Sequence, residues 1–145
     1  MTSGNLGDDI SCEQCTVIFK WATEHHLPVF IYLLSHEQVV KFVEIANEFM
    51  DTTFIVAHMI GADYMNDTLK NENVFFDLSA PQLYSLDILN RSVKKIGVQR
   101  LLLGSDTPYG INNIDKVRKK LIQLSLSDNE IALICGENLA KLLSL

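Results

Sequence analysis

Cysteine is scarce in this sequence of 145 residues, and its three copies cannot all pair within one chain. A disulfide framework is therefore not expected, and the count is typical of a reducing compartment. Cys12 and Cys15 form an isolated C-x-x-C pair. A structural zinc site needs four ligands, and a redox motif is expected to follow a strand, whereas polar residues 7–9 precede this pair. We interpret the pair as part of a helix.

Positive charge and long apolar runs are also in short supply. The chain has 12 Lys and Arg against 18 Asp and Glu, a net charge of −6, which argues against nucleic acid as a partner. Its apolar runs are too short to span a membrane, which takes about 20 residues. The first ten residues, MTSGNLGDDI, lack the basic and then apolar pattern of a signal peptide. We therefore expect a cytoplasmic protein without a membrane partner.

The remainder of the chain alternates between helical and strand-like patterns. Apolar runs bounded by turn residues predict four strands, and three- and four-residue apolar spacing predicts helices between them. The strands are expected near 29–33, 53–58, 74–78 and 100–105, and the helices at 10–26, 36–50, 62–71, 82–96 and twice more before the C-terminus. The last helix begins with a capping box, Ser127 to Glu130. This order predicts an α/β fold with a parallel sheet in a single domain, 10–145, after a flexible lead, 1–9.

Polar side chains stand where these strands end. Parallel strands share one carboxyl edge, and ligands bind at that edge. Alternation along the strands places Phe54, Val56 and His58 on the same face as Phe30 and Tyr32. His25 and His26 precede a strand, so we expect them at the opposite edge as surface residues. A His or Asp alone would be a structural residue, but together these residues predict a functional site: Tyr32, His58, Asp77, Ser79 and Asp106.

Five stretches give the sequence a family resemblance. In order, "LPVFIYL", "FIVAHMIG", "NVFFDLSA", "VQRLLLGSDTPYG" and "GENLAKLL" resemble the second half of the amidohydrolase-related metal-dependent hydrolases, over about residues 20–145. That family folds as a TIM barrel of eight strands. The resemblance implies that this chain is half of such a barrel, with the last four strands, and that it acts on a small carbonyl substrate through metal-activated water.

The resemblance also implies roles for single residues. His58 matches a sixth-strand His that binds metal or assists catalysis. Asp106 matches an eighth-strand Asp that binds metal and handles the proton of the water, whose pKa a divalent metal can lower from 15.7 to about 7. Asp77, Ser79 and Tyr32 would then contact substrate. Zinc is the expected metal.

Two departures from the family pattern bear on activity. Tyr32 stands where the fifth strand of the family carries a His ligand, and a phenol with a pKa near 10 is a poor ligand. His36 lies one helical turn later and is a weak substitute. The first-strand His-x-His pair has no counterpart. A catalytic zinc normally has three protein ligands, so we expect zinc to be weakly held or absent and the chain to be inactive as a truncated enzyme. The alternative is a non-catalytic relic or an interaction subunit.

Half a barrel would also expose surfaces that a full barrel hides. The expected open edges are the first strand and residues 99–103, because closure alone removes edges from a sheet. The expected concave face would lose its opposite wall, and it would carry these apolar residues: Phe30, Phe54, Val56, Phe75 and Leu102. We therefore predict self-association, or a partner that supplies the missing strands.

Overall fold

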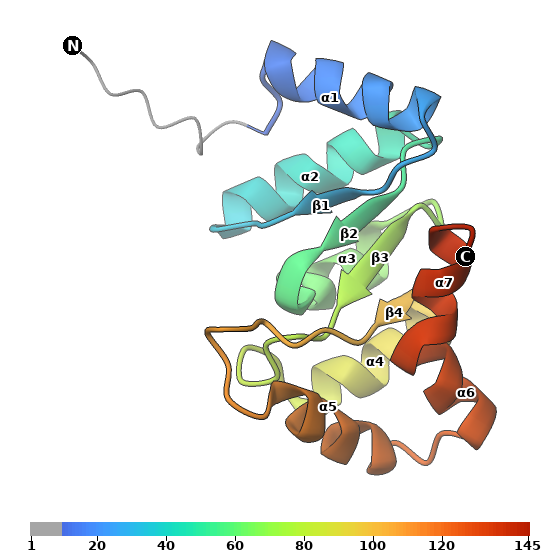
Figure 1. Cartoon of the computed structure of the whole chain (residues 1–145). Helices are drawn as coiled ribbons and strands as arrows, with labels where there is room; N and C mark the ends of the chain where they lie inside the picture. Colours follow the sequence, from blue (N-terminus) through green and yellow to red (C-terminus); the bar gives the residue numbers. More distant parts are fainter. Residues whose placement is uncertain (1–9) are drawn as a thin grey trace.

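The computed structural model describes residues 10–145, and the lead predicted for 1–9 lies outside them. Helices and strands alternate as predicted (Figure 1). The strands are β1 (Val29–Ile31), β2 (Phe54–Val56), β3 (Val74–Asp77) and β4 (Leu101–Leu102). The helices are α1 (Glu13–Glu24), α2 (His36–Glu48), α3 (Ala62–Thr68), α4 (Leu86–Ile96), α5 (Asn113–Ile122), α6 (Asp128–Ala132) and α7 (Asn138–Leu142). Within 10–145, no helix is both long enough and apolar enough to cross a bilayer.

Serine and glycine set several helix ends. The side chains of Ser35 and Ser85 accept hydrogen bonds from amides in the first turns of α2 and α4. Ser127 and Glu130 form the predicted capping box at α6. Gly97 ends α4 with a φ of 85°, a conformation that favours glycine. The last helix of the prediction is interrupted by a π-helical turn, Leu133–Glu137, between α6 and α7.

The four strands form one parallel sheet in the order β1-β2-β3-β4. Each strand pairs with the next along the chain, as in the predicted half barrel. The strands are shorter than predicted. After Val56 the chain leaves the sheet in a 3₁₀ turn, Ala57–Met59, and β4 has two residues. The chain therefore reaches the site through turns at the strand ends.

The register corrects the predicted concave face. Phe30 is paired with Ile55, and Ile55 with Phe75, so these three share one face of the sheet, which we call the inner face. Phe54 and Val56 point the other way, into the core beneath the helices, where both are 0% exposed. Placing them on the concave face was wrong, because neighbouring strands are offset by one residue relative to the predicted alternation.

The β4 edge also differs from the prediction. The amide of Leu103 donates to the carbonyl of Ile134 (2.9 Å). The side-chain amide of Asn138 donates to the carbonyls of Val98 (2.8 Å) and Leu101 (2.9 Å). The C-terminal segment thus covers this edge, which was predicted to be open. At the other end of the sheet, β1 has one neighbouring strand and exposes Phe30.

Candidate functional site

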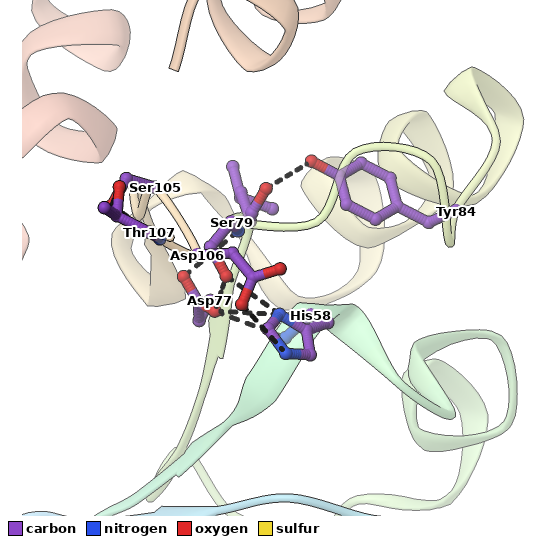
Figure 2. Close-up of polar contacts among 8 residues, drawn as sticks. His58, Asp77, Ser79, Tyr84, Ser105, Asp106 and Thr107 are labelled. Carbon is purple, nitrogen blue, oxygen red and sulfur yellow. Dashed lines mark hydrogen bonds and ion pairs between the residues drawn. The ribbon is translucent and has the colours of Figure 1, made fainter. Parts of the chain in front are cut away.

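The carboxyl ends of three neighbouring strands bring four of the predicted site residues together (Figure 2). His58 lies in the turn after β2, and Asp77 is the last residue of β3. Ser79 follows two residues later, and Asp106 lies in the loop after β4. Because the strands are parallel and adjacent, their ends deliver these side chains to one place.

Asp77 is the buried hub of this group. Its carboxylate accepts hydrogen bonds from the Ser79 amide (3.1 Å) and the His58 amide (3.3 Å). It also accepts a short hydrogen bond from the Ser79 hydroxyl. The His58 ring lies close, with Nδ1 3.5 Å from Asp77 Oδ2. A buried charge needs such donors to offset its lost hydration, so this network fixes Asp77 as an acceptor that orients its neighbours.

Ser79 determines how His58 presents its ring. His58 Nδ1 lies 2.8 Å from Ser79 Oγ. Since the Ser79 hydroxyl already donates to Asp77, its oxygen is left to accept, which assigns the proton of His58 to Nδ1. The other ring nitrogen, Nε2, then carries a lone pair and lies 3.8 Å from Asp106 Oδ1. His58 is thus held through Nδ1, and Nε2 faces Asp106.

Both residues of this pair have an unusual backbone. His58 has φ of 60° and Asp106 has φ of 55°, a left-handed region that non-glycine residues seldom occupy. Two amides, from Tyr109 and Gly110, donate to the Asp106 carbonyl and hold its turn. Conformations of this kind cost about 1–3 kcal/mol and cluster at functional sites. The positive φ at His58 also explains how its side chain reaches the inner side although Phe54 and Val56 do not.

Gly104 allows the β4 loop to come close. A Cβ added at this position would lie 2.2 Å from Asp77 Oδ1 and 2.8 Å from the Ser79 Cβ. A side chain there would push the loop, and Asp106 with it, away from His58. The glycine of the GSD motif is therefore required by packing at the site.

A cavity of about 360 Å³ opens beside the His58–Asp106 pair. Tyr32 reaches it, and its ring lies edge-on to His58 with 5.4 Å between centroids. Asp77 and Ser79 were predicted as substrate contacts, but they are buried and hold His58 from behind. The full lining is Tyr32, His58, Ala80, Gln82, Leu83, Asp106 and Tyr109.

Four residues of the lining are not among the predicted site residues: Ala80, Gln82, Leu83 and Tyr109. The first three follow β3, and Tyr109 lies in the quoted stretch GSDTPYG. Their position after strand ends is the signal that the sequence offers. The prediction rests on ionisable and hydroxyl groups directly at the strand ends, a criterion that these four positions do not meet.

The loop after β3 is anchored from beneath. The Tyr84 hydroxyl donates to the Leu78 carbonyl (2.8 Å), and burial, followed by the charge of Asp77, raises the pKa of Tyr84 well above its usual range. Lys120 donates from α5 to the Pro81 carbonyl (2.6 Å) and to the Tyr84 carbonyl, with its ammonium 4.5 Å from the Tyr84 ring centre. Burial lowers the pKa of Lys120. These contacts fix the wall that carries Gln82.

The donors on the described residues do not complete a metal site. His58 Nε2 and Asp106 Oδ1 are near enough to share an ion, but residues 10–145 contain no cluster of three His, Cys, Asp or Glu that could hold one. His36 turns to Tyr64, with ring centres 5.6 Å apart. His25 stacks on Trp21 in α1, before β1. A catalytic zinc takes three protein ligands, so these residues alone fall one short.

A family model described as Amidohydrolase matches residues 4–145. The chain is a member of the amidohydrolase family. This confirms the resemblance that the strand-end motifs predicted. A search of curated protein sequences found no match.

Solved structures confirm the predicted half-barrel fold. The chain is similar to a zinc-bound amidohydrolase of Burkholderia multivorans (14% identity, TM-score 0.75, 98% of this chain and 63% of that one). It is also similar to a manganese-bound dihydroxybenzoic acid decarboxylase of Polaromonas sp. JS666 (14%, 0.68, 94% and 55%). A third is an uncharacterised TIM-barrel protein of Bordetella bronchiseptica (12%, 0.75, 94% and 52%). The chain thus spans roughly half to two thirds of the length of these structures.

Proposed function

We propose that this chain carries the acid–base side of an amidohydrolase-type active site for a small carbonyl or carboxylic substrate. The observation that carries the proposal is the approach of His58 Nε2 to Asp106 Oδ1, 3.8 Å apart at the edge of a cavity. One group can take a proton from water or substrate while the other gives one back. Hydrolysis and decarboxylation both fit, since the similar structures include an amidohydrolase and a decarboxylase.

The size and lining of the cavity favour a small ligand. Its volume of about 360 Å³ lies at the lower end of the range for ligand pockets. Tyr32 and Tyr109 offer rings for a planar substrate, and Gln82 offers an amide for a carbonyl or carboxylate oxygen. Asp77 and Ser79 act indirectly, by holding His58 in one tautomer.

We also propose that a divalent metal, with zinc as the expected ion, binds weakly through His58 and Asp106. Tyr32 offers a neutral phenol in the place of a third ligand, and the chain is inactive by itself for that reason. The small number of cysteines supports a cytoplasmic setting.

Calorimetric titration with zinc tests this assignment. Tyr32→His should lower the zinc dissociation constant at least about tenfold, which corresponds to about 1.4 kcal/mol. The reason is that the new imidazole adds a third ligand to His58 and Asp106. Tyr109→His is the matched control, since it adds a histidine to the same cavity from another loop. Asp106→Asn should abolish the gain. Equal affinities of the native chain and Tyr32→His would show that position 32 is not a ligand position.

Activity gives a second readout. With zinc or manganese present, Tyr32→His should hydrolyse small esters or decarboxylate aromatic acids above the native background, and Tyr32→His with Asp106→Asn should not. A non-catalytic role is favoured by Tyr32 itself. It gains support if the Tyr32→His variant binds zinc tightly and still leaves every such substrate unchanged.

A further inference from the structure

The N-terminus of α1 brings two cysteine sulfurs together. The Cys12 thiol donates to Cys15 Sγ, and the two sulfurs lie 3.1 Å apart. The sequence predicted a helix through both residues, but α1 begins at Glu13, and Cys12 is its N-cap. Cys12 has extended backbone angles, φ −64° and ψ 158°, so its side chain folds back over the first turn. This geometry, rather than helical spacing alone, makes the two sulfurs meet.

The same geometry favours a reactive sulfur on Cys12. The Cys15 amide donates to Cys12 Sγ (3.4 Å), at the end of a helix where backbone N–H groups point outward. A donated hydrogen bond at a helix N-terminus stabilises negative charge on sulfur, and thiolate is the form that attacks disulfides. Both residues are half-buried, so a small reagent can reach them.

We infer that Cys12 and Cys15 are a redox-active dithiol. The two residues form a reversible intramolecular disulfide by exchange with low-molecular-weight disulfides. The sulfurs need to approach by about 1 Å to reach the bonded length of about 2.05 Å. The site lies on α1, apart from the His58–Asp106 pair, and the inference does not depend on the proposed function.

The reaction is thiol–disulfide exchange in two steps, with glutathione disulfide as the oxidant. Cys12 loses its thiol proton to solvent, the thiolate attacks one sulfur of glutathione disulfide, and one glutathione leaves as its thiolate. Cys15 then loses its proton to solvent and attacks Cys12 Sγ, which releases the second glutathione. Starting from two thiols, the chain loses two protons and two electrons, and glutathione disulfide takes up both to become two glutathione thiols.

Oxidation would tie the N-cap of α1 to its third residue. Phe19, one turn further along α1, packs edge-on against Phe54 of β2 with 5.3 Å between ring centres. The disulfide therefore forms at the start of a helix that is anchored on the core, and the first turn is held in place before the bond closes. The folded chain should for this reason form the disulfide more readily than the unfolded chain.

Mass spectrometry of the full chain tests the inference. The Cys135→Ser variant, which removes the exposed third cysteine, is equilibrated in glutathione buffers of increasing oxidised fraction and quenched with an alkylating agent. We expect the tryptic peptide of residues 1–20 to become two hydrogen masses lighter and resistant to alkylation. The equilibrium constant should be at least about tenfold more favourable in buffer than in concentrated urea.

Single variants assign the two roles. Cys15→Ser should accumulate glutathione on Cys12. Cys12→Ser should react with glutathione disulfide several-fold more slowly than Cys15→Ser does. Equal rates would overturn the assignment of Cys12 as the attacking residue. Two glutathiones on the 1–20 peptide, bonds between chains, or equal constants in buffer and urea would overturn the inference itself. Circular dichroism of each variant confirms that the buffered samples are folded.

Discussion

The two faces of the sheet differ sharply, although they share the same strands. Under the helices, Phe54 is 0% exposed and packs edge-on against Phe19 and Phe42, with 5.3 Å between ring centres in each pair. On the inner face, Phe30 is 60% exposed. The helix-covered face carries the hydrophobic core, and the inner face carries the exposed ring of Phe30 and, at its carboxyl edge, the candidate site. The helices pack on one side of the four-stranded sheet (Figure 1). The core and the candidate site thus lie on opposite sides of it.

The largest expected effect comes from truncating the same residue type on each face. Phe54→Ala should lower the free energy of unfolding by about 3–5 kcal/mol, because it removes a fully buried ring and leaves a cavity. Phe30→Ala should cost less than about 1 kcal/mol, since most of that ring is exposed in the single chain. Urea unfolding at low protein concentration measures both. Equal costs would mean that the inner face is covered, and the comparison of the faces would fail.

A second prediction concerns what covers the inner face. In the similar solved structures the matched region is 52–63% of the chain, and an uncovered aromatic surface on a sheet favours association. We expect the native chain to self-associate at micromolar concentration through this face. Phe30→Glu should raise the dissociation constant at least about tenfold, equivalent to 1.4 kcal/mol, because association would bury a charge.

Sedimentation velocity over a concentration series measures this effect. Val17→Glu is the matched control, because Val17 is 61% exposed but lies on α1 rather than on the inner face. A native chain that stays monomeric throughout the series would contradict self-association and leave a partner with the missing strands as the alternative. If both variants weaken association alike, the contact lies elsewhere.

The sequence predicted the strand order and the edge of the site because those features are local. Apolar runs between turn residues identify strands, and parallel order places their carboxyl ends together. The assignment of Phe54 and Val56 to a face failed because it depends on the register between strands, which no single strand encodes. The same holds for His58, whose positive φ in the turn after β2 reverses the direction that alternation gives.

The roles of site residues were less predictable than their positions. Asp77 and Ser79 were correctly placed beside His58 at the strand ends, but whether they face a cavity or hold His58 from behind depends on packing after β3 and β4. Gly104 contributes by the absence of a side chain near Asp77. The β4 edge is covered by Asn138, whose side-chain amide donates to the carbonyl of Leu101, 37 residues earlier in the chain. Contacts at that separation leave no periodic signal in the sequence.

The smallest expected effect is a pH-dependent change in stability at the capping box of α6. It concerns the segment that covers β4 and not the apolar core. The Ser127 amide and hydroxyl, in that order, donate to the Glu130 carboxylate and lower the pKa of Glu130 below its ordinary value of 4.5. Because the pKa is lowered in the folded chain, the ionised carboxylate stabilises the fold at pH values above its ordinary pKa. This stabilisation is lost as the pH falls through the lower pKa of the folded chain. Glu130→Gln should therefore lower the melting temperature slightly at neutral pH, and this loss should shrink as the pH falls through the lowered pKa of the native residue. Glu137→Gln removes an equal charge from the same segment outside the capping box and is the control. If Glu130→Gln lowers the melting temperature as much in acid as at neutral pH, the capping box stabilises α6 without the charge of Glu130. The stability of the segment that covers β4 would then depend on pH no more than that of the buried face does.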